Sequence, residues 1–334
     1  MSAASKGGMI GIALIGVGRI GSLHAANVSL HSRLRLVAVY DFDPAAARRV
    51  ARTNGTEQAR FEEILSDSTI EGVVIASPTT EHLSQARACA AAGKAVLLEK
   101  PVDLDPEKAR EAAGDLSNAR LLVGFNRRFD PHFLDLKAQI DQGAIGALES
   151  LSITSGDPAP PPASYLAISG GIFKDMAIHD FDMVRFLLSE EPTTVFAMGS
   201  ALFDPGARET GDFDTARTLL STASGRLATV SNTRRSGVGY DQRIEAFGAK
   251  GLARAGNPRR STVAVSSETG TRSAPLLDFF LDRYAEAYRA EMDHFAEVIA
   301  GAPPRASFAD GLAALEIAQA AGRSAKSGEA VRLG

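Results

Sequence analysis

In the first half of the chain, short apolar runs alternate with longer segments of helical periodicity. The apolar runs fall at residues 9–15, 34–40, 72–76, 95–99 and 121–124, and helical patterns lie between them, including residues 81–92 and 106–116. An unbroken apolar run is typical of a strand that is buried on both faces. Strands that alternate with helices predict an α/β fold, in which a doubly wound parallel sheet has helices on both of its faces.

Beyond about residue 146 the pattern changes to short strand-like runs separated by turns. These runs fall at residues 148–155, 193–202, 215–220, 227–233, 242–247 and 261–265. They predict a large, mainly antiparallel sheet with one open face, which another subunit would cover. Helices are predicted at residues 278–300 and 308–324. We therefore expect a doubly wound domain over residues 1–125 and an α+β domain over residues 126–334.

Composition narrows the classes of function. The chain has 334 residues, of which 45% are hydrophobic and 23% are charged, and this suits two globular domains. A net charge of -4, with no basic run, argues against nucleic acid or an anionic membrane as the partner. Cys89 is the only cysteine, which excludes disulfides within the chain and cysteine-rich metal sites. No stretch approaches the roughly 18 apolar residues of a membrane span. These features predict a cytoplasmic protein with a small-molecule partner.

A glycine motif, Gly16-Val17-Gly18-Arg19-Ile20-Gly21, follows the first apolar run and leads into a helical pattern. The first glycine permits a tight turn, the second lets the backbone approach a pyrophosphate, and the third lets the helix lie close to the strand. The helix N-terminus, which begins with Arg19 and Ile20, is then left to bind the anion. The motif predicts a Rossmann domain that binds a dinucleotide.

Asp41 follows the second apolar run, close to the spacing from Gly16 at which an acid binds the cofactor ribose. A carboxylate there accepts hydrogen bonds from both ribose hydroxyls but repels a 2′-phosphate, so the predicted cofactor is NAD rather than NADP. Asp41 also begins a turn in which Asp43 would cap the next helix, with Pro44 at its first position. A role confined to that turn is the alternative for Asp41.

Two further strand ends carry polar residues where the ligand of a doubly wound sheet lies. One end reads Ser77-Pro78, with His82 one turn into the next helix, and the other reads Glu99-Lys100. We expect these residues to contact the cofactor. Lys100 is also a candidate catalytic residue, because its ammonium group could donate to a substrate oxygen and stabilise developing alkoxide charge. The alternatives are a structural histidine and a solvated loop lysine.

The segment 170–188, GGIFKDMAIHDFDMVRFLL, is the candidate catalytic helix. At 3.6 residues per turn Asp175, His179 and Asp182 share one stripe, and apolar side chains form another. A carboxylate four residues before a histidine can orient the imidazole, which leaves the ring able to take a proton from a substrate. An exposed ion pair is the alternative interpretation. No metal site is expected, because the base and its electrostatic partner already account for the chemistry.

These stretches, in this order, resemble the Gfo/Idh/MocA family of glucose-fructose oxidoreductases and inositol dehydrogenases. The resemblance rests on the glycine motif, EKP at residues 99–101, GFNRRF at 124–129, and the double glycine at 170–171 followed by Asp175, His179 and Asp182. Within the family, YDQRIE at residues 240–245 and RYAEAY at 283–288 look most like the inositol 2-dehydrogenases. The resemblance spans essentially the whole chain.

The resemblance implies that Lys100, Asp175 and His179 act together beside the nicotinamide, with Arg127 and Tyr240 near a polyol. It also implies a homo-oligomer, usually a tetramer.

One loop departs from the family pattern. Many inositol dehydrogenases have a His and an Asn before the catalytic helix, where this chain has Gly156-Asp157-Pro158. Asp157 can still bind a substrate hydroxyl, but the departure leaves open which polyol is preferred.

The expected reaction is the NAD-dependent oxidation of myo-inositol to 2-keto-myo-inositol (scyllo-inosose), a step of inositol catabolism. His179 would remove the hydroxyl proton while hydride leaves the same carbon for the nicotinamide. Three alternatives stay open. They are the same chemistry on scyllo-inositol or another sugar with NAD or NADP, an NAD-bound sensor without catalysis, and a glycoside hydrolase that uses bound NAD transiently.

Overall fold

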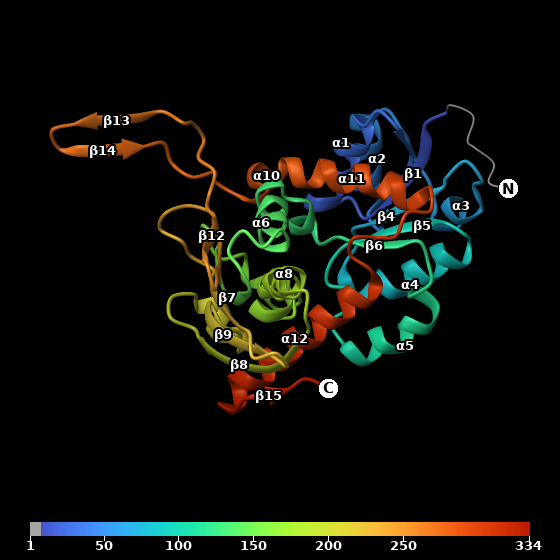
Figure 1. The fold of residues 1–334 in the computed structure, drawn as a ribbon. Coiled ribbons are helices and arrows are strands. Elements are labelled where there is room, and N and C mark those ends of the chain that lie inside the picture. Colours follow the sequence, from blue (N-terminus) through green and yellow to red (C-terminus); the bar gives the residue numbers. More distant parts are fainter. Residues whose placement is uncertain (1–7) are drawn as a thin grey trace. The chain divides into compact units, whose positions relative to one another are not determined.

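The computed structural model describes residues 8–334, and the chain divides into two units (Figure 1). The first unit contains the described residues up to Asn126 and also residues 288–312, and the second contains residues 127–287 and 313–334. The expected boundary after residue 125 lies next to this division. The return of the chain to the first unit near its end was not expected from the sequence. Residues 1–7, which the sequence assigns to the first domain, lie outside the described residues.

The first unit is built on a six-stranded parallel sheet in the order β3-β2-β1-β4-β5-β6. Its strands are β1 (Ile10–Ile15), β2 (Leu34–Tyr40), β3 (Glu57–Gln58), β4 (Gly72–Ile75), β5 (Ala95–Leu98) and β6 (Leu121–Val123). Its helices are α1 (Arg19–Ser29), α2 (Pro44–Asn54), α3 (Phe61–Ser66), α4 (Thr79–Ala91), α5 (Pro106–Leu116) and most of α11 (Ala285–Ile299). Every residue of β4 and β5 is buried, as their apolar runs predict. The predicted doubly wound sheet is confirmed, and its strand order reverses between β1 and β4.

The returning segment completes the first unit by packing directly on its sheet. A Cβ added to Gly72 of β4 would lie 2.7 Å from Ile299 and 3.1 Å from Phe295, so α11 lies in contact with the strand. The amide of Val123 in β6 donates to the carbonyl of Ala306 over 2.8 Å. The sequence predicted one helix over residues 278–300, but the structure has two, α10 (Phe280–Arg283) and α11, separated at Tyr284.

The second unit contains a seven-stranded sheet in the order β12-β11-β7-β10-β9-β8-β15. The strands are β7 (Leu148–Gly156), β8 (Pro192–Ser200), β9 (Thr215–Thr222), β10 (Leu227–Thr233), β11 (Asp241–Gly248), β12 (Gly251–Ala255) and β15 (Val331–Arg332). The helical segments are η1 (Asn126–Phe129), which begins at the last residue of the first unit, α6 (Pro131–Asp141), α7 (Ala163–Leu166), η2 (Phe173–Ala177), α8 (Ile178–Leu188), α9 (Pro205–Thr210), α10 and most of α12 (Phe308–Ser327). In the described part of the chain, no helix is both long and apolar enough to cross a membrane.

The two faces of the second sheet differ. All neighbouring strands are antiparallel except β7 and β10, and α8 packs against β7 (Figure 1). The helix and Ala177 directly before it bury the apolar stripe predicted for the segment 170–188, which consists of Ala177, Ile178, Phe181, Val184, Leu187 and Leu188. The other face exposes large apolar side chains, namely Met198, Leu219, Leu227, Phe247 and Leu252. The predicted open-faced, mainly antiparallel sheet is confirmed.

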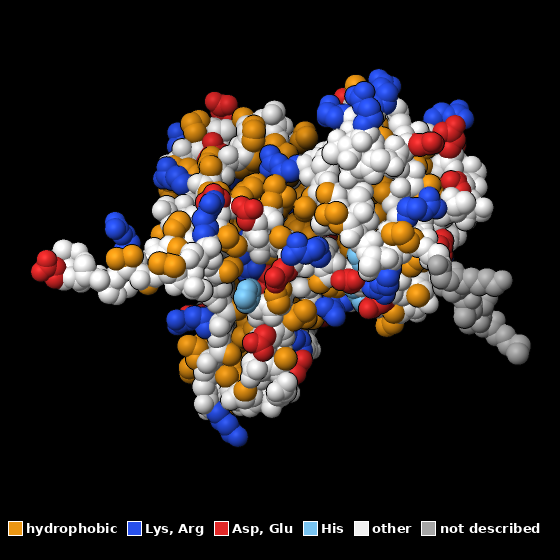
Figure 2. Space-filling view, turned by 90° about the horizontal axis from the view of Figure 1, so that it is seen from above, with side chains coloured by type: hydrophobic (Ala, Val, Ile, Leu, Met, Phe, Trp, Pro, Cys, Tyr) orange, Lys and Arg blue, Asp and Glu red, His pale blue; other side chains and the backbone are white. Residues whose placement is uncertain are grey.

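A two-stranded hairpin, β13 (Ala264–Ser267) and β14 (Gly270–Ser273), projects from the second unit (Figures 1 and 2). All residues of both strands are exposed, including Val265, and Val263 beside them is exposed as well. A two-stranded hairpin is only marginally stable by itself in water. The sequence predicted the first strand within residues 261–265, and the structure has it a few residues later.

Candidate active site

The glycine turn after β1 has the geometry that a dinucleotide needs. Gly16 has a positive φ of 87°, and a Cβ there would lie 2.4 Å from the amide nitrogen of Ser77. A Cβ on Gly21 would lie 1.9 Å from the carbonyl oxygen of Gly16, so the helix can approach the strand only without a side chain. Gly18 caps α1 with no atom within 4 Å of an added Cβ. The open space at the helix N-terminus fits a pyrophosphate, with Arg19 and Ile20 in the first turn.

Asp41 lies at the end of β2 and is joined to the glycine turn. Its Oδ2 accepts a hydrogen bond of 2.7 Å from the amide of Val17, and its Oδ1 accepts one of 2.8 Å from the amide of Asp43. Asp43 in turn caps α2, which has Pro44 in its first turn, so the predicted cap is confirmed. Asp41 therefore takes part in the turn and is also held beside the backbone that would face the pyrophosphate.

His82 links two strand ends of the first unit. It is buried in α4, and its Nε2 lies 2.9 Å from the carbonyl of Ser77 while its Nδ1 lies 2.8 Å from that of Pro101. Burial lowers the pKa of His82, so the ring is neutral and donates to one of the two carbonyls. The contacts fit a histidine that positions the loops after β4 and β5. Pro78, which follows Ser77 in the chain, is the N-cap residue of α4.

Glu99 fixes the backbone at the end of β5. Its Oε1 lies 2.8 Å from Nε2 of the buried His24, and its Oε2 accepts a hydrogen bond of 3.2 Å from the amide of Lys100. Gly124 makes room for this carboxylate, because a Cβ there would lie 3.1 Å from it. Nearby, burial and then the charge of Glu99 raise the pKa of Glu291, a fully buried acid. The backbone amide of Lys100 is thus held by a buried network of polar side chains.

In the second unit the candidate catalytic residues lie on two kinds of helix. The sequence predicted one α-helix over residues 170–188, but the structure has a π-helical segment, η2, which contains Asp175 and is followed by α8. Asp175 therefore lies in a π-helical turn and His179 in the α-helix that follows it. Wider π-helical turns are frequent at functional sites. Asp175 and His179 are both partly exposed, so the imidazole is not buried in the core.

Two donors hold the Asp175 carboxylate. The Tyr165 hydroxyl donates to its Oδ1 over 2.8 Å, and Nη1 of Arg234 donates to its Oδ2 over 3.2 Å. At the start of the segment the amide of Ile172 donates to Asp212 over 2.9 Å. These contacts set the orientation of the carboxylate that precedes His179.

Two acidic side chains of α8 form buried ion pairs with arginines. Asp180 accepts hydrogen bonds from Arg127, from the Ser155 hydroxyl at 2.6 Å and from the Asn232 amide at 2.7 Å. Asp182 is held by Arg128 through two hydrogen bonds of 2.9 and 2.6 Å. Asp182, which was predicted to share a stripe with Asp175 and His179, is thus buried in an ion pair. No group of three or more metal-ligating side chains occurs among residues 8–334.

The predicted polyol-binding residues meet at one end of the second sheet. Gly156, the last residue of β7, pairs with Thr233 and with Asp241, the first residue of β11. Asp157, which follows β7, and Tyr240, which precedes β11, therefore lie at the same end of the sheet. Arg127 is almost fully buried there. Although burial opposes its charge, Tyr284, Asp180 and Tyr240 together raise the pKa of Arg127. Burial also raises the pKa of the Tyr240 hydroxyl, which remains protonated.

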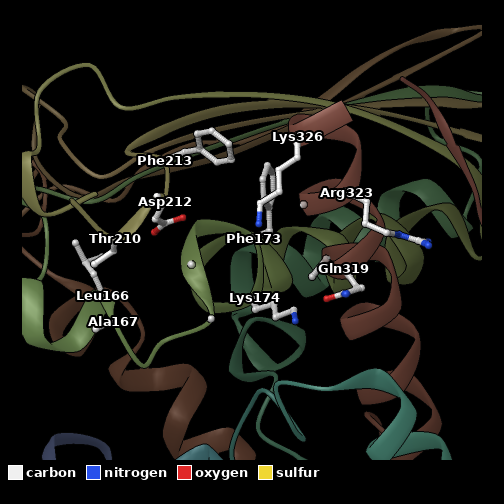
Figure 3. A pocket seen from close by; sticks show the side chains of 15 residues that line it. Leu166, Ala167, Phe173, Lys174, Thr210, Asp212, Phe213, Gln319, Arg323 and Lys326 are labelled. Atoms are coloured by element: carbon white, nitrogen blue, oxygen red, sulfur yellow. The ribbon is translucent and has the colours of Figure 1, made fainter. Parts of the chain in front are cut away.

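The sequence reasoning missed several residues of these networks, including Tyr165, Asp180, Asp212, Arg234 and His24. Asp180 carried the clearest signal, because an acid beside an apolar stripe must have a buried partner. A cavity of about 320 Å³ borders the same region of the second unit (Figure 3). It is lined by side chains of η2, the segment 210–213 and α12, including Lys174, Asp212 and Arg323.

Comparison with known proteins matches both halves of the chain to one family. Residues 10–125 match the model of the oxidoreductase family with an NAD-binding Rossmann fold, and residues 133–254 match the GFO/IDH/MocA C-terminal domain. The inositol 2-dehydrogenase of Rhizobium meliloti is 48% identical over 314 residues, which cover 93% of this chain and 95% of that protein.

Solved structures of inositol dehydrogenases are similar to this chain over nearly its whole length. A myo-inositol dehydrogenase from Corynebacterium glutamicum is 41% identical with a TM-score of 0.93, and the match covers 98% of this chain and 99% of that one. The scyllo-inositol dehydrogenase of Lactobacillus casei with bound NAD(H) and scyllo-inositol is 29% identical with a TM-score of 0.90, and the match covers 97% and 99% of the two chains. The chain is therefore an NAD-dependent oxidoreductase that belongs to the GFO/IDH/MocA family.

Proposed function

We propose that the protein oxidises myo-inositol at a secondary hydroxyl and forms 2-keto-myo-inositol (scyllo-inosose). The observation that carries the proposal is the Asp175 carboxylate, which Tyr165 and Arg234 fix on the π-helical segment leading to a partly exposed His179. A fixed carboxylate next to an accessible imidazole suits removal of a proton from an alcohol. The names of the similar proteins, inositol dehydrogenases over nearly their whole length, support the same substrate class.

In this proposal three residues of the chain perform the chemistry. His179 takes the proton of the reacting hydroxyl, and Asp175 orients the imidazole and stabilises its charged form. Lys100 donates a hydrogen bond to the same oxygen as negative charge develops on it. Bound NAD supplies the hydride acceptor for the carbon that is oxidised.

The remaining hydroxyls of a cyclic polyol need many donors and acceptors. Arg127, Asp157 and Tyr240 supply a cation, a carboxylate and a hydroxyl at one end of the second sheet. The proposal assigns them to substrate binding. For the cofactor it assigns Gly16, Gly18, Arg19 and Ile20 to the pyrophosphate, Asp41 to the ribose, and Ser77, Pro78, His82, Glu99 and Lys100 to the strand ends beside the nicotinamide.

We also propose a homotetramer in the cytoplasm. The open face of the second sheet exposes five large apolar side chains, and the hairpin β13–β14 has both strands exposed. Surfaces of this kind are commonly covered by another copy of the same chain. A single buried cysteine suits a reducing compartment. Light scattering on the purified protein measures the number of subunits.

A dehydrogenase assay tests the function directly. Formation of reduced cofactor is followed with myo-inositol, scyllo-inositol and an aldose, each with NAD and with NADP. We expect the highest kcat/KM with myo-inositol and NAD. A higher value with scyllo-inositol would transfer the proposal to that substrate, which the similarity to a scyllo-inositol dehydrogenase and the loop at Asp157 favour as the second candidate. No reduction with any polyol would leave the non-catalytic sensor and the glycoside hydrolase, and only the hydrolase would release a free sugar from a glycoside.

Two variants test the assigned base. His179→Ala should lose on the order of a hundredfold or more in kcat, as is usual when a general base is removed. His132→Ala is the control, because His132 is exposed on α6 and has no assigned role in the reaction. NAD binding should be equal in both variants. Wild-type turnover in His179→Ala would remove His179 from the mechanism. Activity that survives a strong chelator is also expected, because no step needs a metal.

A further inference from the structure

Arg234 is a buried arginine directly after β10 that the sequence motifs do not include, and the proposed reaction uses it only through its contact with Asp175. Its side chain is 1% exposed, and its backbone amide donates to the carbonyl of Asp214 over 2.8 Å. The next residue, Arg235, is exposed and lies over the ring of Phe203. Burial of an arginine side chain is costly unless opposite charges compensate it. The buried charge of Arg234 therefore requires acidic partners nearby.

The guanidinium of Arg234 lies between two carboxylates. Its Nη1 is 3.2 Å from Oδ2 of Asp175, and its Nη2 is 3.6 Å from Oδ2 of Asp212. Both carboxylates are themselves largely buried, with side chains that are 14% and 10% exposed. Within residues 8–334 its Nε and Nη2 have no hydrogen-bond acceptor. The arginine thus acts mainly as a charge that two acids share.

The two acids hold opposite ends of one short segment. Asp212 accepts the amide of Ile172, and Gly171 leaves room for this carboxylate because a Cβ there would lie 2.7 Å from its Oδ1. Asp175 lies three residues further along, inside η2. Figure 3 shows Asp212 across the cavity from Phe173 and Lys174 of the same segment. A bridge through Arg234 therefore spans the π-helical turn that leads into His179.

We infer that Arg234 is a positioning residue for the catalytic dyad. Its charge allows two buried carboxylates to face one another, and it thereby keeps Asp175 in the orientation that serves His179. Without the cation the two acids repel, and the segment 171–175 loses the link between its ends. The role of Arg234 in turnover rests on the proposed function, whereas the ionic bridge can be tested without any substrate.

A charge-compensation series tests the inference in the full-length protein. Arg234→Gln should lower kcat about 30-fold or more, the loss expected when one member of a buried charge pair is truncated, with KM for NAD unchanged. Arg234→Lys retains the charge and should keep most of the activity. Asp212→Asn can still accept the amide of Ile172 but removes one negative charge. In the Arg234→Gln background it should therefore restore part of kcat instead of lowering it further.

Arg283→Gln is the matched control. Arg283 is equally buried and paired with Asp130 in the same unit, so its loss should reduce thermal stability while kcat per folded molecule stays near that of the wild type. A purely structural role for Arg234 predicts the same behaviour as Arg283. It also predicts that Arg234→Lys fails like Arg234→Gln and that the double variant is worse than either single variant. Any of these results would overturn the inference.

A spectroscopic arm separates this inference from the proposed function. Carbon-13 labelling of the histidine rings gives a signal for His179, identified by its loss in His179→Ala. The signal should shift in Arg234→Gln, return toward its position in Arg234→Lys, and stay in place in Arg283→Gln. If the wild type oxidises no polyol, the proposed function fails and this measurement alone decides. An unchanged ring signal in Arg234→Gln would then overturn the positioning role.

Discussion

Two glycines of the cofactor turn should respond to the same substitution in opposite ways. A Cβ at Gly21 would lie 1.9 Å from the carbonyl oxygen of Gly16, and this backbone atom has no freedom to move away. Gly21→Ala must therefore push α1 from β1 and should destabilise the apo protein by about 1–3 kcal/mol. A Cβ at Gly18 meets no atom within 4 Å, and its φ of -63° suits alanine. Gly18→Ala should leave apo stability within about 1 kcal/mol of the wild type.

The effect on NAD should be the reverse. The added methyl group of Gly18→Ala occupies the space through which the pyrophosphate approaches the amides of α1. At an NAD concentration 100 times the wild-type Kd, binding stabilises the protein by about 2.7 kcal/mol. If Gly18→Ala weakens binding about 30-fold, the same relation leaves about 0.9 kcal/mol. The loss is therefore about two thirds of the stabilisation.

Thermal melting with and without NAD, at one protein concentration, measures both quantities. A fluorescence titration gives the Kd of each variant directly. We expect a near-normal apo melting temperature and a small NAD shift for Gly18→Ala, and a lowered apo melting temperature for Gly21→Ala. Wild-type affinity in Gly18→Ala, or a wild-type apo melting temperature in Gly21→Ala, would refute the reasoning.

Three other predictions concern buried charged and titratable groups. Asp182→Asn leaves Arg128 without its counter-charge and should cost about 3–5 kcal/mol in urea unfolding, whereas Asp182→Leu combined with Arg128→Met should recover most of that loss. Burial, and then the charge of Glu99, raise the pKa of Glu291. The contribution of the Glu291 side chain to folding stability is therefore fully present below about pH 4.5 and declines as the pH rises. Glu291→Gln should raise the melting temperature by a few degrees more at about pH 8 than at about pH 5. Burial raises the pKa of Cys89 to about 12, so iodoacetamide at about pH 8 should label it only after denaturation, as intact mass will report.

Much of the first unit could be predicted because its signals are local. The glycine motif, the buried apolar runs and the Asp43 cap each depend on residues close together in the chain. The apolar stripe of α8 was predictable for the same reason, since its period is that of the helix. The open face of the second sheet followed from alternation along single strands.

Features that depend on distant contacts could not be predicted in this way. The π-helical turn of η2 begins where the amide of Ile172 bonds to Asp212, a residue 40 positions away. Arg234 and Arg235 are adjacent and identical in type, yet one is buried against two acids and the other is exposed. Only the end of β10 and its neighbours decide which of them turns inward. A single sequence contains no local signal for that choice.

The return of residues 288–312 to the first unit matters for anyone who exchanges parts between members of this family. A fragment that ends at Asn126 would lack the helix that lies against Gly72 and the carbonyl that pairs with Val123, so it would leave apolar sheet surface open to water. A chimera that transplants the nucleotide-binding portion must therefore carry two stretches of chain from the same parent. Recombination at the single junction near residue 126 would combine a sheet from one protein with a covering helix from another.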